Sequence, residues 1–104
     1  MARTPEGKVK DKVTAMLKKH GVFYFLPGNN GFGTSGIPDY VCCVDGRFIG
    51  IECKADKSKS ATPLQMKAAA AITAAGGRWF LAYDDETIAG VESAILSYKK
   101  DIRR

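Results

Sequence analysis

Histidine and long apolar runs are scarce in this chain of 104 residues, and each shortage excludes a class of protein. The single histidine, His20, gives little basis for histidine acid–base catalysis or a Ser-His-Asp triad. No apolar run approaches the roughly 20 residues that span a bilayer, and the N-terminal segment lacks the apolar core of a signal peptide. We therefore expect an intracellular, cytoplasmic protein with no membrane contact.

Cysteine is also limited, and its pattern argues against a zinc site. Cys42, Cys43 and Cys53 form no Cys-x-x-Cys pair, and the only histidine lies far away in sequence. All three cysteines fall within predicted strands. We interpret them as reduced residues of the core.

Positive charge exceeds negative charge, with 16 Lys and Arg against 11 Asp and Glu and a net charge of +5. The length fits a single domain over residues 1–104, and 45% hydrophobic residues suit a packed core. The excess of positive charge is compatible with an ordinary basic protein or with a polyanionic partner such as nucleic acid. Composition alone does not separate the two.

Apolar periodicity and turn residues predict the order α-β-β-β-α-β-α. The first helix should run from about Thr4 to His20, with Thr4 as its N-cap. Strands are expected at about residues 22–26, 39–44, 47–54 and 78–83, and further helices at about 62–75 and after Asp84. The last strand should join the sheet by a crossover. We expect an α/β protein (α+β mixed sheet) with helices on the sheet's faces.

Residues 28–36 form a Gly-rich loop, and residues 31–36 match the pattern G-x-G-x-x-G. We reject dinucleotide binding, because that pattern must open a helix, whereas Ile-Pro-Asp and a strand follow here. The loop is either a plain connector or a segment that lies against a ligand. The sequence does not decide between them.

An Asp-Gly pair at residues 45–46 lies between two apolar runs and predicts a hairpin with a two-residue turn. In that register Val44 lies opposite Arg47, and each outward step adds one residue per strand. Asp39 then lies opposite Glu52. Opposed residues have Cβ atoms about 5 Å apart, so the two carboxylates would repel each other.

A divalent cation would relieve this repulsion. Carboxylate oxygens suit Mg²⁺, with Mn²⁺ as a substitute. Lys54 shares the face of Glu52 and could orient a metal-activated water or stabilise charge on a phosphate. Each residue alone has a plainer interpretation as a solvated strand or turn residue. Their convergence with Asp39 favours a metal site.

The residues Gly36-Ile37-Pro38-Asp39, followed by Glu52-Cys53-Lys54, resemble the Pro-Asp…Glu-x-Lys signature of the PD-(D/E)xK nucleases. Thr-Pro-Glu at residues 4–6, the basic loop after Lys54 and Thr-Pro-Leu-Gln at residues 62–65 resemble the VRR-Nuc family, in its small, stand-alone, phage-type form. The resemblance covers about residues 4–83. It implies a restriction-endonuclease-like PD-(D/E)xK core.

The same resemblance implies an Mg²⁺-dependent endodeoxyribonuclease, a phosphodiester hydrolase that acts on branched DNA such as four-way (Holliday) junctions. It also implies a homodimer, and a bacterial host cell as the location if the protein is phage-encoded. The implied site consists of the metal ligands Glu6, Asp39, Glu52 and the Cys53 backbone carbonyl, and the catalytic residues Asp39, Glu52, Lys54 and Gln65.

Glu6 and Gln65 also have structural interpretations. Glu6 in a first helical turn favours the helix dipole, although it extends an apolar stripe and should point inward. Gln65 can complete a capping box with Thr62, although it is also in phase to face the sheet. We expect that one Gln65 side chain cannot fill both roles, and we favour the site role for both residues.

Lys57 and Lys59 follow the signature and are predicted to contact DNA phosphates, or else to form a solvated charge run. The lysines of the first helix, Lys10 among them, are interpreted mostly as its exposed face. The alternative to a nuclease is a non-catalytic basic nucleic-acid-binding module. A third hypothesis is a structural homodimer with the charged hairpin end as its interface.

Overall fold

A computed structural model describes residues 3–28 and 35–101 and contains the predicted order of elements. Most of the Gly-rich loop, with most of its G-x-G-x-x-G match, lies outside the described residues. The elements are α1 (Pro5–Lys19), β1 (Phe23–Phe25), β2 (Tyr40–Val44), β3 (Arg47–Cys53), α2 (Pro63–Ala74), β4 (Arg78–Ala82) and α3 (Asp85–Asp101).

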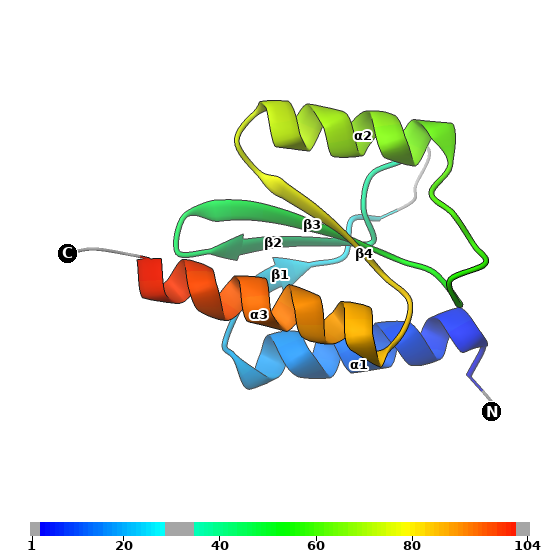
Figure 1. Ribbon diagram of the computed structural model, residues 1–104, viewed down its shortest axis with the longest axis horizontal. Helices are drawn as coiled ribbons and strands as arrows, with labels where there is room; N and C mark the ends of the chain where they lie inside the picture. The colour runs from blue at the N-terminus through cyan, green and yellow to red at the C-terminus, as the bar shows by residue number, and fades with distance from the viewer. Residues whose placement is uncertain (1–2, 29–34, 102–104) are drawn as a thin grey trace.

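The four strands form one mixed sheet in the order β1-β2-β3-β4. The first two pairs are antiparallel, whereas β3 and β4 are parallel and are joined through α2 by the predicted crossover. Helix α2 covers one face of the sheet, and α1 and α3 cover the other (Figure 1). This arrangement confirms the prediction of a mixed sheet with helices on its faces.

The hairpin has the predicted register. Asp45 and Gly46 have φ values of 49° and 88°, which is the left-handed backbone that a two-residue hairpin turn requires. The pairing runs without a shift from Val44 and Arg47 at the turn to Tyr40 and Ile51 at the far end. One step further outward, the two predicted acids, Asp39 and Glu52, lie at the same end of the hairpin.

The main core lies between the sheet and the helices α1 and α3. Helix α1 contributes its predicted apolar stripe, and burial alternates along β2, whereas every residue of β3 from Ile49 to Cys53 is buried. Cys42 and Cys53 belong to this core, whereas Cys43 is exposed on the opposite face, so its prediction as a core residue was wrong. The fully buried side chains include Val13, Leu17, Tyr40, Cys42, Val44, Ile49, Ile51, Cys53, Val91 and Ile95.

Helix α2 approaches the segment before β2 very closely. Gly36 has a φ of +83°, and a Cβ at this position would lie 2.4 Å from the carbonyl oxygen of Leu64. Gly50 of β3 likewise makes room for the ring of Pro38, whose Cγ would lie 2.8 Å from an added Cβ. These two glycines let the segment before Asp39 pass between α2 and the sheet. No helix in the described part of the chain is long and apolar enough to cross a membrane.

Candidate metal and phosphate site

Asp39 is held at the end of the hairpin by the backbone of the partner strand. Its Oδ2 atom accepts a hydrogen bond of 2.8 Å from the backbone N–H of Cys53, the residue after Glu52. A charge-assisted bond to a backbone N–H fixes the carboxylate in one orientation. The structure therefore brings together the two acids that the hairpin register predicts.

Glu52 is the one charged residue that is buried in the described part of the chain, with 4% of its surface exposed. The Nε2 atom of Gln65 donates a 2.8 Å hydrogen bond to its Oε2 atom. Its Oε1 atom is buried and has no hydrogen-bond partner among the described residues. An unpaired carboxylate oxygen in such a place costs free energy unless a ligand or proton satisfies it.

The environment of Glu52 favours its protonated form. Burial raises the pKa of this carboxyl to about 7, and the neighbouring charge of Asp39 acts in the same direction. The positive charge of Lys54 opposes both effects but does not overcome them. A cation bound to Glu52 and Asp39 would favour the ionised form instead.

Gln65 completes the capping box and also contacts Glu52, so the prediction that one side chain cannot serve the cap and face the site at once was wrong. Its Oε1 atom accepts a 2.8 Å hydrogen bond from the backbone N–H of Thr62, and Thr62 caps α2 in return. The other end of the same amide, Nε2, donates to Glu52. A primary amide carries an acceptor and a donor, and α2 places one on each side.

Lys10 lies in the site, which corrects its interpretation as part of the exposed face of the first helix. Its Nζ atom is 3.6 Å from Oδ1 of Asp39 and 3.5 Å from Oε2 of Glu6. Glu6 therefore joins the site through Lys10, one helical turn away on α1. The i,i+4 spacing of Glu6 and Lys10 is the feature of the sequence from which this ion pair could have been predicted.

Tyr40 fixes α1 against the hairpin next to Asp39. Its buried hydroxyl donates a 2.9 Å hydrogen bond to the backbone carbonyl of Lys10 and pairs with the Thr14 hydroxyl at 2.6 Å. Because Tyr40 directly follows Asp39 in the chain, these bonds set the position of Lys10 relative to that carboxylate.

The remaining predicted residues lie around this group. Lys54 follows β3, where its charge acts on Glu52. Lys57 and Lys59 are exposed in the loop between β3 and α2, and neither lines the cavity described next. His20 pairs with Glu92 at 2.6 Å, at the opposite end of α1 from Glu6 and Lys10.

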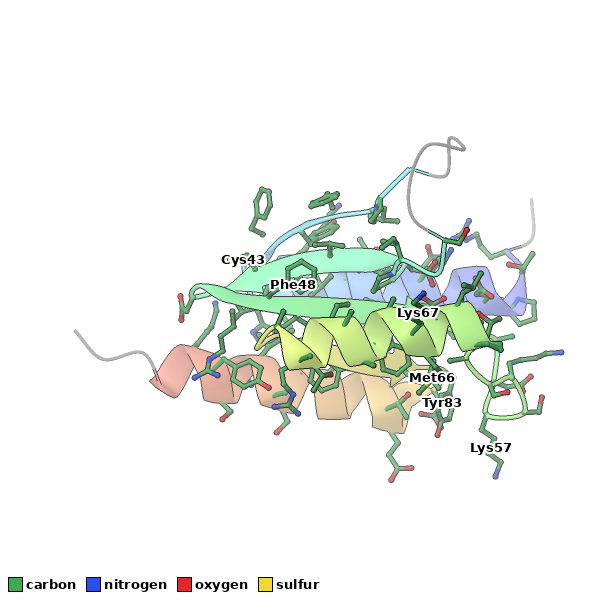
Figure 2. The ribbon with its side chains drawn as sticks, turned by 90° about the horizontal axis from the view of Figure 1, so that it is seen from above. Cys43, Phe48, Lys57, Met66, Lys67 and Tyr83 are labelled. Atoms are coloured by element: carbon green, nitrogen blue, oxygen red, sulfur yellow. The ribbon has the colours of Figure 1, made fainter. Side chains whose placement is uncertain are left out.

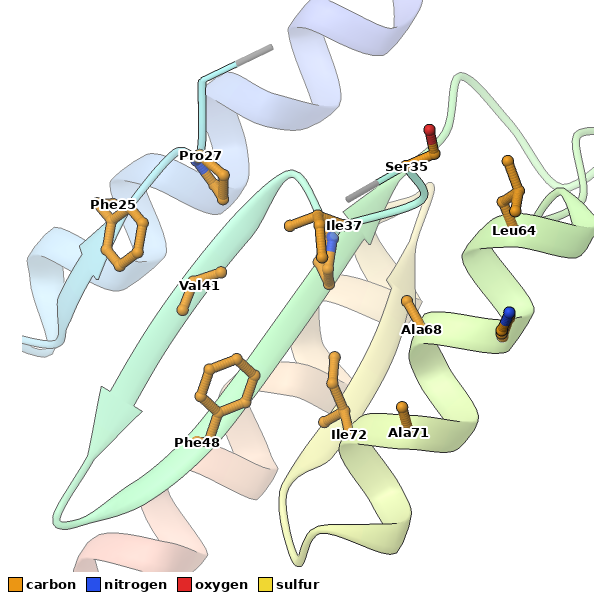
Figure 3. Close-up of a pocket in the computed structure, with 12 residues that line it drawn as sticks. Phe25, Pro27, Ser35, Ile37, Val41, Phe48, Leu64, Ala68, Ala71 and Ile72 are labelled. Atoms are coloured by element: carbon orange, nitrogen blue, oxygen red, sulfur yellow. The ribbon is translucent and has the colours of Figure 1, made fainter. Parts of the chain in front are cut away.

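Two adjoining hollows lie beside this group of residues. The polar one has a volume of about 520 Å³, and Lys10, Asp39, Glu52 and Gln65 line it. The second, of about 550 Å³, is apolar. In Figure 3, Val41 and Phe48 of the hairpin face Ala68 and Ile72 of α2 across it.

The two hollows are continuous with each other. Both are lined by Pro27, Ser35, Ile37 and Pro38, which lie just before, at the end of and just after the Gly-rich loop. A ligand with a charged group at the acids would therefore meet an apolar surface directly beside it.

The donor set fits a hard divalent cation. Among residues 3–28 and 35–101, no three or more His, Cys, Asp or Glu side chains form a group that could enclose a metal. Mg²⁺ does not need such a cage, because it is commonly held by one or two carboxylates together with water and substrate phosphates. Asp39 and Glu52, with its unpartnered oxygen, would supply the two carboxylates. The ligand predicted at Cys53 is its backbone carbonyl, and its thiol is unsuitable because burial raises the thiol pKa to about 12.

No protein-family model matches the chain, and no curated protein is similar to it in sequence. The resemblance to the VRR-Nuc family therefore remains a prediction carried by the motif residues and their arrangement.

Proposed function

We propose that the chain is an Mg²⁺-dependent endodeoxyribonuclease of the VRR-Nuc type, with a PD-(D/E)xK core, that cleaves branched DNA such as four-way junctions. The observation that carries this proposal is the buried Glu52 carboxylate. One of its oxygens has no partner, and the other is held by Gln65 beside Asp39. A buried carboxylate in this setting is costly, and a cation bound between Glu52 and Asp39 would remove that cost, which supports the proposal.

The residues of the site have separable roles in phosphodiester hydrolysis. Asp39 and Glu52 would hold the metal, and Gln65 would orient Glu52. Bound Mg²⁺ would polarise a phosphoryl oxygen and lower the pKa of a water. Lys54 would orient a water for in-line attack on phosphorus. The water would form the new P–O bond and lose a proton to solvent, while the P–O3′ bond breaks and O3′ takes up a proton from solvent, which leaves a 5′-phosphate and a 3′-hydroxyl.

The excess of positive charge favours DNA as the partner of this site. A net charge of +5 raises the affinity for any polyanion, and Lys57 and Lys59 are exposed on the loop after β3. We propose that these two lysines contact backbone phosphates without reading bases. A homodimer would present two such sites to the two strands of a symmetric junction, and light scattering measures its mass.

Cleavage of labelled duplex, flap, single-stranded and four-way-junction DNA, in Mg²⁺ and in EDTA, tests the proposed activity. We expect Mg²⁺-dependent cleavage of the branched substrates. Asp39→Asn and Lys54→Ala should each lower the cleavage rate at least about 10³-fold, because the first weakens the ligand set for Mg²⁺ and the second removes a positive charge beside the reacting phosphate. Asp56→Asn, in the exposed loop after β3, is the matched control and should cleave at the wild-type rate.

Two results would overturn the proposal. Undiminished Mg²⁺-dependent cleavage by Asp39→Asn would show that the site lies elsewhere. Salt-sensitive DNA binding with no cleavage in any divalent metal would identify the non-catalytic nucleic-acid-binding module instead.

A further inference from the structure

Lys10 occupies an unusual position for a lysine on a helix surface. Its ammonium group lies between two carboxylates, 3.5 Å from Glu6 and 3.6 Å from Asp39, and it lines the polar cavity. Its side chain is 31% exposed, so it is partly withdrawn from solvent. The positive charge is therefore located at the cavity wall, where the proposed metal ligands also lie.

The charges at the site account for this position. Three carboxylates, those of Glu6, Asp39 and Glu52, interact at the same end of the hairpin, and in the absence of a cation they destabilise one another. The ammonium group of Lys10 lies within ion-pair distance of both Glu6 and Asp39, and its positive charge offsets part of this repulsion.

We propose that Lys10 is a built-in counter-cation, which holds Asp39 in the metal-free protein, is displaced from it by the divalent cation, and then contacts a DNA phosphate. This inference rests on the proposed metal site. An ammonium group and a metal ion compete for the same carboxylate oxygen, so Lys10 lowers the affinity for the metal while keeping the empty site stable.

The anchoring of Lys10 fits such an exchange. Its backbone carbonyl accepts a hydrogen bond from the buried Tyr40 hydroxyl, so α1 stays in place when the side chain moves. The flexible stem of lysine then lets the ammonium group turn within the cavity. A phosphate bound beside Asp39 would then pair with the Lys10 ammonium group. This pair would replace the one between Lys10 and Asp39.

Calorimetric titration of the full chain with Mn²⁺, without DNA, tests the competition. Lys10→Gln should bind Mn²⁺ about threefold to fivefold more tightly than the wild type, the effect expected from removing one partly exposed ion pair. Lys10→Met should do the same, and Lys10→Arg should stay close to the wild type. Lys8→Gln is the matched control, because Lys8 is an exposed lysine one half-turn away on α1. It should leave the Kd within about twofold of the wild type, as expected for a screened surface charge.

Thermal unfolding supplies a readout that does not depend on activity. In EDTA, Lys10→Gln should lower the Tm by about 2–4 °C, whereas Lys8→Gln should leave it unchanged. Saturating Mn²⁺ should bring the Tm of Lys10→Gln back to that of the wild type.

The outcomes separate this inference from the proposed function. If the wild type binds no Mn²⁺, the metal site and the role of Lys10 both fail. If Mn²⁺ binds but Lys10→Gln and Lys8→Gln have the same Kd and Tm, the metal site stands and the counter-cation role of Lys10 is overturned.

Discussion

The two faces of the sheet are built in different ways. Helices α1 and α3 seal one face, where Ile49 and Ile51 of β3 are completely buried. Helix α2 alone lies over the other face, where the side chain of Phe48 remains 44% exposed. Figure 2 shows Phe48 and Cys43 beside α2 rather than beneath it.

The difference follows from the composition of the helices. Helix α2 is rich in alanine, and Ala69 is its one buried residue. Alanines let a helix approach a sheet closely, but they cover little area, so hollows remain around them. The sealed face therefore supplies most of the stability, whereas the face under α2 keeps open the space in which the proposed chemistry takes place.

The largest expected contrast is in stability. Ile51→Ala should lower the free energy of unfolding by about 2–5 kcal/mol, because it leaves a cavity in the sealed core. Phe48→Ala on the open face should cost about 1 kcal/mol or less, since much of this side chain is already in water. Urea denaturation followed by circular dichroism measures both. Equal losses would show that the face under α2 is as tightly packed as the other.

An intermediate effect is expected from the buried acid. Because the pKa of Glu52 is raised from 4.5 to about 7, the folded chain holds a proton in that pH window that the unfolded chain releases. The stability from this group is therefore present at low pH and is lost as the pH rises through 7. In EDTA, the stability of Glu52→Gln relative to the wild type should rise by about 1–3 kcal/mol between pH 4.5 and pH 8.

Denaturant unfolding at several pH values provides this comparison. Mg²⁺ at pH 8 should stabilise the wild type more than Glu52→Gln, because the variant loses one of the two carboxylates that would hold the ion. A difference between the two proteins that does not vary with pH would contradict the raised pKa of Glu52.

The smallest effect separates the two roles of Gln65. Thr62→Ala removes the cap of α2 and should cost about 1 kcal/mol of stability with cleavage unchanged. Gln65→Leu removes both the acceptor for the Thr62 N–H and the donor to Glu52, so it should cost about 1 kcal/mol of stability and also lower cleavage about 10–100-fold. Urea denaturation and the junction-cleavage assay measure the two quantities on each variant. If both variants lose stability and activity together, the cap and the site are not separable.

The parts of the fold that local chemistry decides could be predicted from the sequence. The Asp-Gly pair at residues 45–46 fixed the turn, and with it the register that brings Asp39 and Glu52 to the same end. Thr4 and Thr62, each followed by proline, marked the starts of α1 and α2. Turn and cap residues act within a few positions of the chain, so their effects need no knowledge of tertiary contacts.

The contacts between distant elements could not be predicted in the same way. Lys10 was interpreted as exposed because helix periodicity does not reveal that Tyr40 draws this turn of α1 to the hairpin. Gln65 has two partners because the start of α2 lies beside Glu52 of β3, and no local sequence pattern specifies that placement. Cys43 is exposed on the face of the sheet that α2 covers only in part. The alternating pattern of a strand does not predict how much of each sheet face a helix covers.

The close contact at Gly36 has a consequence for how this site can change over evolution. A single added methyl group there would meet the backbone of Leu64, the residue before Gln65, and would have to displace the start of α2. A descendant could therefore keep Lys10, Asp39, Glu52 and Gln65 and still lose their alignment through one substitution at a position with no functional group. Gly36 is thus as informative a marker of an intact site in related chains as the acids themselves.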